Sequence, residues 1–319
     1  MLKFNKLTRE ELNEYMKMGL DEKIKLSSEI IQDFLSNVDN DKVYISSSFG
    51  KDSVVTIDLV RKENPDIPIL FMNTGVEHKS CIELSKEYDN VIELTPKKGM
   101  KQIVEEYGYI LPLGKDKSNA IEQVRRNIHD GKFDTYRCKQ FRGDLTGKMF
   151  DYTGLVPHLL APFKISDRCC YYLKRSPISS FQKKEGYDYY FTGITAEESM
   201  HRRNALVKNG FNTDTQSSPI GHWRANDVLE YIVKNGLKLA SCYGDVVEEN
   251  GKYSTTLFQR TGCVCCPVSA HREKPNKFQL FYENERDTWD FVINELGYGK
   301  VLDWFDIPYH EIPKELKEE

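Results

Sequence analysis

The chain has 319 residues, of which 39% are hydrophobic and 29% charged, and these are the proportions of a folded globular protein. No run of about 18 apolar residues occurs and no apolar segment follows the charged N-terminus, so the sequence predicts neither a membrane span nor a signal peptide. We therefore expect a cytoplasmic protein of one large or two ordinary domains, with no membrane partner.

The net charge of −4 hides an uneven distribution of charge along the chain. Residues 111–150 carry nine Lys or Arg against five acids, whereas residues 283–319 carry eleven acids against four bases. The basic block is typical of a surface that contacts phosphates or a nucleic acid. A solvated helical face is the alternative interpretation of the same block.

The N-terminal third of the sequence alternates between helical and strand patterns. Such alternation predicts βαβ units and a parallel sheet. The expected elements, in chain order, are helices at 8–20 and 22–38 (the second capped by Asp21), a strand from Val43, a helix at 52–62, a strand at 67–72, a helix at 79–88, a strand at 91–95 and a helix at 98–107.

Residues 110–166 interrupt this alternation with a basic segment in which helices are expected at 119–129 and 137–150. A strand returns within 186–194, and a helix from Asn226 or Asp227 ends at Gly236, a C-cap glycine. The predicted fold class is α/β, a twisted, mainly parallel sheet flanked by helices. The predicted regions are an N-terminal helical extension at 1–40, an α/β domain at 41–240 with a helical insertion at 110–166, and a cysteine-rich C-terminal region at 241–319.

A loop rich in Ser and Gly, Ser46 to Gly50, joins the Val43 strand to the next helix. Amides at a helix N-terminus, hydroxyls and Lys51 together predict an anion site, with an ordinary turn as the alternative. The loop is not a P-loop motif, because Ile45 stands where that motif requires a glycine. Asn73-Thr74-Gly75 ends the next strand, so both segments are expected to line one crevice.

Five of the eight cysteines fall in two groups, Cys169-Cys170 and Cys263-Val264-Cys265-Cys266. In a reducing compartment such grouping predicts a metal or a cluster before disulfides. Four thiolates suit a [4Fe–4S] cluster, with a structural zinc as the runner-up because zinc sites usually use two Cys-x-x-Cys pairs. Buried cysteines that serve as small hydrophobic residues are the remaining alternative.

The segment Ser48-Phe49-Gly50-Lys51-Asp52-Ser53 resembles the pyrophosphate loop of ATP pyrophosphatases and sulfonucleotide reductases. The cysteine spacing is similar to the cluster pattern of assimilatory adenylyl-sulfate reductases and of the ATP pyrophosphatase of DNA phosphorothioation systems. Both belong to the phosphoadenosine phosphosulfate reductase family. The resemblance runs in order over residues 40–270 and includes the segments Cys169 to Pro177, Thr192 to Arg203 and Ser218 to Ile232.

This resemblance implies roles for individual residues. Lys51 and Asp52 would be catalytic, and the cluster ligands would be Cys169, Cys170, Cys263 and Cys266. The nucleotide would be held by Ser46, Ser48, Gly50, Lys51, Asp52, Ser53, Asn73, Thr74, Gly75, Gly193, Arg202 and Arg203. Asp52, Glu197 and Glu198 are candidate ligands of Mg²⁺.

Two departures from the reductases favour ATP as the nucleotide. Those reductases carry a catalytic cysteine in a C-terminal tail, whereas no cysteine follows Cys266 here, and many of them lack the Lys51-Asp52-Ser53 sequence. We therefore expect an ATP pyrophosphatase-type enzyme that adenylates an acceptor for sulfur transfer. The alternatives are a sulfonucleotide reductase that uses Cys138 or Cys265, and a non-catalytic nucleotide-binding redox sensor. Expected partners are ATP or a sulfonucleotide, Mg²⁺, a sulfur donor protein such as a cysteine desulfurase, a nucleic acid acceptor and a second copy of the chain.

Overall fold

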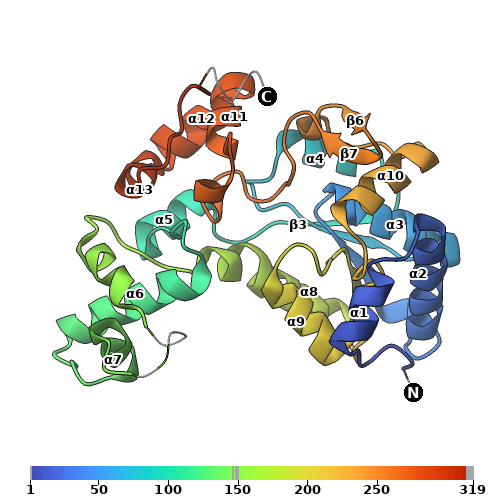
Figure 1. Cartoon of the computed structure of the whole chain (residues 1–319), viewed down its shortest axis with the longest axis horizontal. Helices are drawn as coiled ribbons and strands as arrows, with labels where there is room; N and C mark the ends of the chain where they lie inside the picture. Colours follow the sequence, from blue (N-terminus) through green and yellow to red (C-terminus); the bar gives the residue numbers. More distant parts are fainter. Residues whose placement is uncertain (1, 146, 148–150, 314–319) are drawn as a thin grey trace. The chain divides into compact units, whose positions relative to one another are not determined.

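The computed structural model describes residues 2–145, 147 and 151–313 (Figure 1). The chain divides into two compact units: Met1–Asn73, Glu77–Thr95 and Pro177–Gly262 form the first, and Thr74–Val76, Pro96–Ser176 and Cys263–Glu319 form the second. Within the described part of the chain, no helix has the length and apolar character needed to cross a membrane.

The first unit is built on a five-stranded, all-parallel sheet with the strand order β3-β2-β1-β4-β5 among the described residues. Central strand β1 pairs with β2 on one side and β4 on the other, with Ile45 opposite both Ile69 and Phe191. The mainly parallel sheet predicted from the alternating pattern is therefore confirmed. The strands are β1 (Val43–Ser47), β2 (Ile69–Met72), β3 (Val91–Leu94), β4 (Tyr189–Thr192) and β5 (Gln216–Ser217).

Helices cover this sheet, and α3, which follows β1, contacts both α2 and α10 (Figure 1). A buried ion pair between Lys23 of α2 and Asp227 of α10, at 2.5 Å, ties two of these helices together. The helices are α1 (Arg9–Tyr15), α2 (Leu20–Leu35), α3 (Lys51–Glu63), α4 (Lys79–Ser85), α8 (Ser176–Glu185), α9 (Met200–Asn209) and α10 (Ala225–Asn235). Shorter elements are the 3₁₀ turns η1 (Asn40–Lys42) and η5 (Ser241–Tyr243) and the hairpin β6 (Val246–Glu249) with β7 (Lys252–Thr255).

The second unit is mainly helical, and Arg125 organises its basic segment. The guanidinium of this α6 residue donates to the carbonyls of Leu159 and Phe163, at 3.0 and 2.7 Å, so it holds the chain around η3. The elements are α5 (Met100–Tyr107), α6 (Lys115–His129), α7 (Tyr136–Arg142), η3 (Thr153–Leu160), η4 (Tyr171–Arg175), η6 (Ala270–Arg272), α11 (Lys277–Asn284), α12 (Arg286–Asp290), η7 (Phe291–Glu295) and α13 (Gly299–Trp304).

Several expected helix limits are wrong, since the helix expected at 8–20 ends at Tyr15, the one expected at 79–88 ends at Ser85 and the one expected at 119–129 begins at Lys115. The helix expected from residue 22 begins at Leu20, because Gly19 is the extended N-cap residue and Asp21 lies inside the first turn. The helix expected at 137–150 ends at Arg142, because Gly143 adopts the left-handed conformation that terminates helices. Residues 146 and 148–150 of that expected helix lie outside the described residues. Gly236 is the left-handed C-cap of α10 as predicted.

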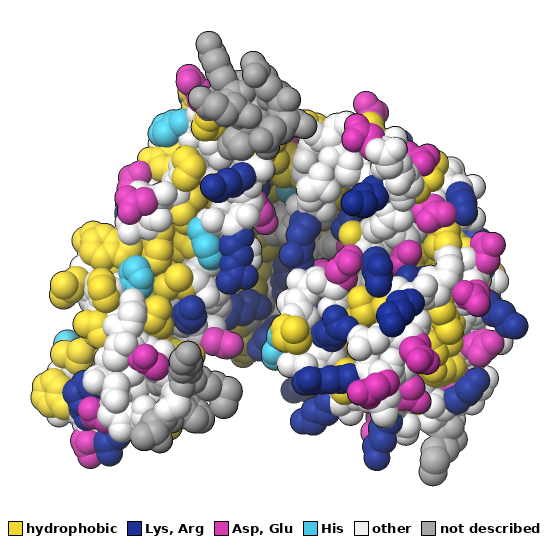
Figure 2. Space-filling model, viewed as in Figure 1, with side chains coloured by type: hydrophobic (Ala, Val, Ile, Leu, Met, Phe, Trp, Pro, Cys, Tyr) yellow, Lys and Arg dark blue, Asp and Glu magenta, His cyan; other side chains and the backbone are white. Residues whose placement is uncertain are grey.

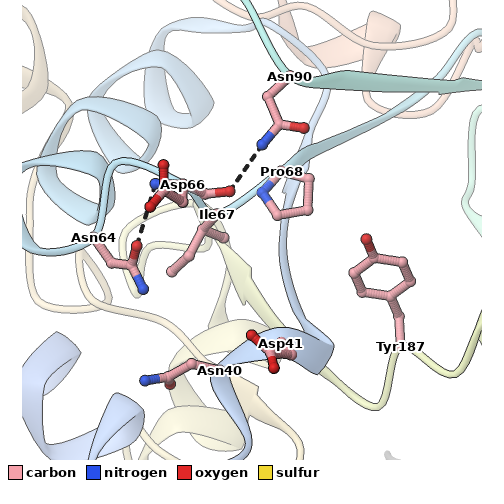
Figure 3. A pocket seen from close by; sticks show the side chains of 8 residues that line it. All are labelled: Asn40, Asp41, Asn64, Asp66, Ile67, Pro68, Asn90 and Tyr187. Carbon is pink, nitrogen blue, oxygen red and sulfur yellow. Dashed lines mark hydrogen bonds between the residues drawn. The ribbon is translucent and has the colours of Figure 1, made fainter.

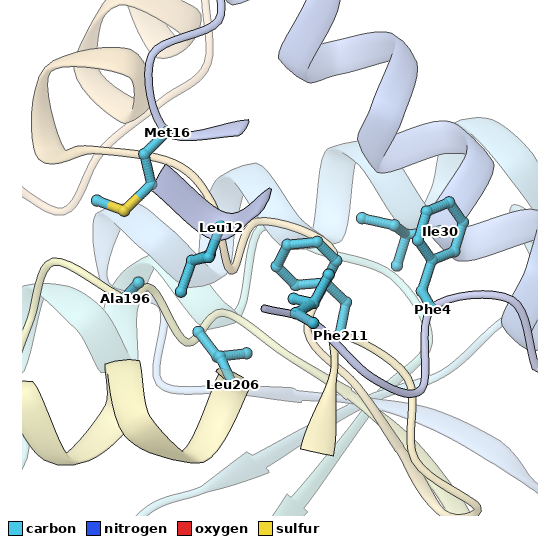
Figure 4. Close-up of a cluster of buried hydrophobic side chains, with 8 residues drawn as sticks. Phe4, Leu12, Met16, Ile30, Ala196, Leu206 and Phe211 are labelled. Atoms are coloured by element: carbon cyan, nitrogen blue, oxygen red, sulfur yellow. The ribbon is translucent and has the colours of Figure 1, made fainter. Parts of the chain in front are cut away.

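The N-terminal segment attaches to the first unit through a buried apolar cluster (Figure 4). Leu12 and Met16 of the N-terminal segment meet Leu206 of α9, while Phe4 packs on Phe211 with ring centroids 6.5 Å apart. The adjoining His222 is fully buried and its ring lies 5.3 Å from that of Phe211. The 1–40 segment is thus packed on the sheet unit through apolar contacts.

We expect the protein to lose stability in mild acid through His222. Burial, together with the charge of Lys23, lowers the pKa of His222 from its ordinary value of 6.5 to about 3. Between these values the unfolded chain binds the proton and the folded chain does not. The free energy of unfolding should therefore fall as pH drops below 6.5, by up to ~1.4 kcal/mol per pH unit.

Urea unfolding of the wild type and of the His222→Phe variant at several pH values from 7 to 4 measures this contribution. The variant should show a shallower dependence on pH, while His201→Gln, a change at an exposed histidine of α9, should leave the dependence unaltered. Equal pH slopes for the wild type and His222→Phe would contradict the assignment.

Candidate functional site

The loop between β1 and α3 has an unusual backbone conformation at Phe49, and the buried side chain of this residue holds it in place. Phe49 has φ of 53°, a left-handed conformation that a bulky residue rarely adopts, and its side chain is fully buried. Its ring packs on Phe71 and Tyr88, with centroids 5.2 and 5.3 Å away. The fixed turn brings Gly50 to the N-cap position of α3 and Lys51 to its first turn.

Two residues from the far end of the first unit brace this turn. The backbone N–H of Lys51 donates to the hydroxyl of Tyr243 at 3.0 Å, and that hydroxyl lies 3.0 Å from Thr261 Oγ1. A Cβ placed on Gly50 would lie 2.5 Å from the same Thr261 oxygen, so only glycine fits. Neither residue is predicted from the sequence. No local motif around Tyr243 indicates this role. The position of Thr261, two residues before Cys263, is a sequence feature that could have drawn attention to it.

The first turn of α3 presents backbone amides, since the first N–H groups of a helix have no carbonyl partner within it. Hydroxyls of Ser48 and Ser53 lie 3.4 Å apart at this turn. The buried Lys51 side chain places its Nζ 3.2 Å from the Asp52 carboxylate. Amides, hydroxyls and an ammonium thus meet at a helix N-terminus, which is the combination from which the loop sequence predicts an anion site.

Two arginines add positive charge near this turn. Burial and the nearby Arg260 lower the pKa of Arg202, whereas Asp52 acts in the opposite direction, so Arg202 lies close to both. The carboxylate of Glu198 pairs with both arginines and thereby holds them together. Figure 2 shows basic side chains gathered over α9, the helix that carries Arg202. Arg260 was not predicted, and Arg203 donates to Asn13 in α1.

The other expected nucleotide contacts follow the neighbouring strands. Gly193 directly follows β4 and packs against α3. A Cβ on this residue would lie 2.9 Å from the carbonyl oxygen of Asp52. Asn73 follows β2 and donates from its side chain to Glu93 at 2.8 Å. Thr74 and Gly75 belong to a short segment of the second unit. Gly193, Asn73 and the loop therefore all lie at carboxyl ends of adjacent strands.

A cavity of about 320 Å³ opens at the opposite edge of the sheet (Figure 3). Its lining residues precede the strands: Asp41 precedes β1, Pro68 precedes β2 and Asn90 precedes β3. Asn90 donates to the carbonyl of Asp66 at 2.8 Å. This polar group of the cavity wall is therefore already hydrogen-bonded within the turn before β2. Ligands of parallel sheets bind at the carboxyl ends of strands, whereas this cavity lies at their amino ends.

The two cysteine groups come together in the second unit. All eight cysteines of the chain are described and none is in a disulfide. Burial raises the pKa of Tyr298 well above its ordinary value, and the nearby thiols act in the same direction. These thiols belong to Cys265, Cys169, Cys266 and Cys263. The Tyr298 hydroxyl has no hydrogen-bond partner among the described residues. A buried polar atom therefore faces a group of thiols.

The local contacts favour the thiolate form of Cys170, whereas the bond to Cys170 and burial raise the pKa of Cys169. The Cys169 thiol bonds to Cys170, which lowers the pKa of Cys170 to about 5, and Lys115 and Lys174 act in the same direction. Cys266 N–H donates to the Cys263 carbonyl at 3.0 Å, which closes the Cys-x-x-Cys turn. Among the described residues, no three His, Cys, Asp or Glu side chains already stand in the arrangement of a metal site. The donor chemistry fits a thiolate-bound group, and the thiols are neighbours rather than converged ligands.

The sequence profile described as the phosphoadenosine phosphosulfate reductase domain matches residues 42–129 and 150–269, which is more than half of the chain. The chain therefore belongs to the phosphoadenosine phosphosulfate reductase domain family, and the resemblance recognised from its motifs is confirmed.

Among curated proteins, an uncharacterised protein of Methanocaldococcus jannaschii is 24% identical over 97% of this chain, which spans 63% of the length of that relative. The adenosine 5'-phosphosulfate reductase of Geobacillus kaustophilus is 22% identical over 72% of this chain and 74% of its own length. That of Lysinibacillus sphaericus is 22% identical over 68% and 74%.

Two solved structures are similar at low scores. Phosphoadenylyl-sulfate reductase from Candida auris, in a phosphate complex, is 14% identical with a TM-score of 0.40, over 74% of this chain and 90% of its own. The U34-tRNA thiolase NcsA from Methanococcus maripaludis, with its [4Fe-4S] cluster, is 13% identical with a TM-score of 0.37, over 90% and 82%.

The Gly50→Ala variant tests whether the close packing of the turn serves nucleotide binding. The new methyl group would displace Thr261 and Tyr243 and so disturb the hydrogen bond to Lys51. We expect ATP to bind at least about tenfold more weakly, the cost of one good hydrogen bond. Calorimetric titration with ATP measures this.

Gly99 offers a matched control, because it is the N-cap of α5 with almost the same backbone angles and nothing within 4 Å of its Cβ position. Gly99→Ala should bind ATP like the wild type. Adding Thr261→Ala to Gly50→Ala should restore part of the affinity by removing the clash. Unchanged ATP binding by Gly50→Ala would show that the turn does not hold the nucleotide.

Proposed function

We propose that this chain is an adenylating enzyme that cleaves ATP between its α- and β-phosphates and prepares an acceptor for sulfur transfer. An acceptor oxygen attacks the α-phosphorus, the bond to the bridging oxygen of the β-phosphate breaks, and pyrophosphate leaves. The observation that supports this proposal is the meeting of the α3 N-terminus with the Lys51 ammonium and two arginines, Arg202 and Arg260. A departing pyrophosphate carries several negative charges, and such a site is suited to stabilise them.

The residues around the α3 N-terminus have different roles in this proposal, according to their positions. The α3 amides and Lys51 bind the β- and γ-phosphate oxygens, because they lie at the positive end of the helix dipole. Glu198 neutralises part of the charge of Arg202 and Arg260 and keeps their guanidinium groups together. Since this ion-paired group is in place before the nucleotide arrives, little reorganisation is needed when charge develops on the leaving group.

Asp52 is the best placed of the proposed Mg²⁺ ligands. Glu197 accepts a hydrogen bond of 2.6 Å from the N–H of Ala225, the first residue of α10, and Glu198 is held by the two arginines. Asp52 lies in the first turn of α3 with only Lys51 as its ion-pair partner among the described residues. When bound, Mg²⁺ would neutralise phosphate charge and orient the triphosphate.

We further propose that Cys169, Cys170, Cys263 and Cys266 hold a [4Fe–4S] cluster, with zinc as the alternative. These cysteines lie near one another, and Lys115 and Lys174 stabilise the thiolate form of Cys170. The hydroxyl of Tyr298, which has no hydrogen-bond partner among the described residues, would be available to donate to a sulfur of the bound group. The cluster, when bound, would supply a site for the transferred sulfur.

The acceptor we propose is a polyanion such as a nucleic acid, bound by the basic segment. Much of its charge is used internally, since Arg125 serves the carbonyls around η3 and Arg142 pairs with Asp144 at 2.6 Å. The exposed aromatic side chains of Phe133 and Tyr136 lie between these basic residues in the sequence and could stack on bases. A sulfur donor protein and a second copy of the chain remain predictions.

Replacing Lys51 by Ala should abolish most pyrophosphate release from ATP. Loss of an ammonium aimed at the leaving group is expected to slow the reaction by about 100-fold or more. Lys62→Ala, which removes a half-exposed lysine at the far end of the same helix, is the control and should retain the rate. An unchanged rate of pyrophosphate release in Lys51→Ala would rule out the proposed role of Lys51.

Reduction of a sulfonucleotide is the second candidate function, because two curated relatives are adenosine 5'-phosphosulfate reductases. The same protein should then release sulfite from adenosine 5'-phosphosulfate when a thiol reductant is supplied. Sulfite without pyrophosphate would favour this reaction over adenylation.

Metal analysis of the protein purified without oxygen tests the cluster. The wild type should contain iron and sulfide, and Cys263→Ser should lose most of both because one ligand is missing. Cys138→Ser is the control, since the Cys138 thiol instead bonds the Lys132 carbonyl at 3.5 Å. If the wild type contains zinc and no iron, the cluster proposal is wrong and the alternative, a zinc site, is correct.

A further inference from the structure

A second pair of cysteines lies in the first unit, apart from the four proposed cluster ligands. Cys81 is in the first turn of α4 and Cys242 is in η5, and only 1% and 4% of their surfaces are exposed. The backbone N–H of Cys242 donates to the Ser80 hydroxyl at 3.1 Å, so this residue lies against the direct neighbour of Cys81. The two thiols also hydrogen-bond to each other.

The surroundings make the two thiols chemically different. The bond from Cys81, supported by His78 and Ser80, lowers the pKa of Cys242 to about 5, whereas the same bond and burial raise the pKa of Cys81. Cys242 is therefore the thiolate and nucleophile, and Cys81 is the thiol that can follow it. The mechanism above uses neither residue.

We propose that Cys81 and Cys242 are a redox modification site that a peroxide converts to a disulfide. The Cys242 sulfur attacks one peroxide oxygen, the O–O bond breaks, and the departing hydroxide takes a proton to become water. The Cys81 thiol then loses its proton and attacks the Cys242 sulfur, so that an S–S bond forms and hydroxide leaves to become a second water. The two thiols lose two electrons and the peroxide gains them. A small thiol reverses the change.

One residue connects this pair to the turn before α3. The Thr261 hydroxyl bonds the Cys81 thiol and lies 3.0 Å from the Tyr243 hydroxyl, which in turn accepts the Lys51 N–H. The same Thr261 oxygen occupies the space beside Gly50. Oxidation converts the Cys81 thiol that Thr261 contacts into one half of an S–S bond, and Cys242 is the direct sequence neighbour of Tyr243. The disulfide should therefore loosen the turn and weaken nucleotide binding, an effect that rests on the proposed function.

Peptide mapping of the intact protein tests the disulfide without any activity assay. After treatment with hydrogen peroxide and blocking of the remaining thiols, trypsin should release residues 80–86 linked to residues 239–252, and a reductant should separate them. In the Cys81→Ser variant the link should be absent, and Cys242 should instead be trapped as a sulfenic acid by dimedone. Recovery of both peptides unlinked and fully alkylated from the treated wild type would overturn the proposal.

ATP titration of the same samples tests the connection to the turn. The oxidised wild type should bind ATP about tenfold more weakly and regain its affinity on reduction. The Cys81→Ala, Cys242→Ala double variant should have the same ATP affinity before and after the peroxide treatment, which controls for oxidation of the other cysteines. A linked protein with unaltered ATP affinity would overturn the connection alone, and the pyrophosphate assay judges the proposed function separately.

Discussion

The hydrogen bond from the Lys51 N–H to the Tyr243 hydroxyl joins residues that are 192 positions apart in the chain. It takes up one amide of the α3 N-terminus and fixes the entry of the chain into that helix, while the buried ring of Phe49 fixes the turn from the other side. A helix N-terminus can bind an anion only if its amides are held in place. The candidate nucleotide site therefore depends on a contact made late in the chain.

This dependence gives the segment from Tyr243 to Cys266 more than one task. Tyr243 and Thr261 brace the turn, Arg260 adds charge beside Arg202, and Cys263 follows two residues after Thr261 as a proposed cluster ligand. Residues of the candidate nucleotide site and the proposed cluster ligands thus stand close together in the sequence. The Cys81 and Cys242 pair is attached to the same segment through Thr261.

The cysteine group shows a different kind of long-range assembly. Cys169 and Cys170 precede η4, whereas Cys263 and Cys266 form a tight turn, and both segments belong to the second unit. Tyr298, from the aromatic C-terminal region, is buried near these cysteines, and its hydroxyl has no hydrogen-bond partner in the part of the chain that the structure describes. Leaving such a group unsatisfied costs free energy, so its position beside four thiols supports a bound group there.

The sequence by itself determined the parallel sheet, the loop before α3 and the grouping of the cysteines, because these follow from local patterns of apolar residues, turn residues and spacing. It misplaced the N-cap of α2 and the end of α7, since Gly19 and Gly143 set these limits through backbone conformation. Only the tertiary structure decided that Tyr243, Thr261 and Arg260 lie at the candidate nucleotide site, that Arg203 bonds α1, and that Cys81 meets Cys242. The reason is physical: each of these contacts joins distant segments, and no local pattern records where a folded chain brings them together.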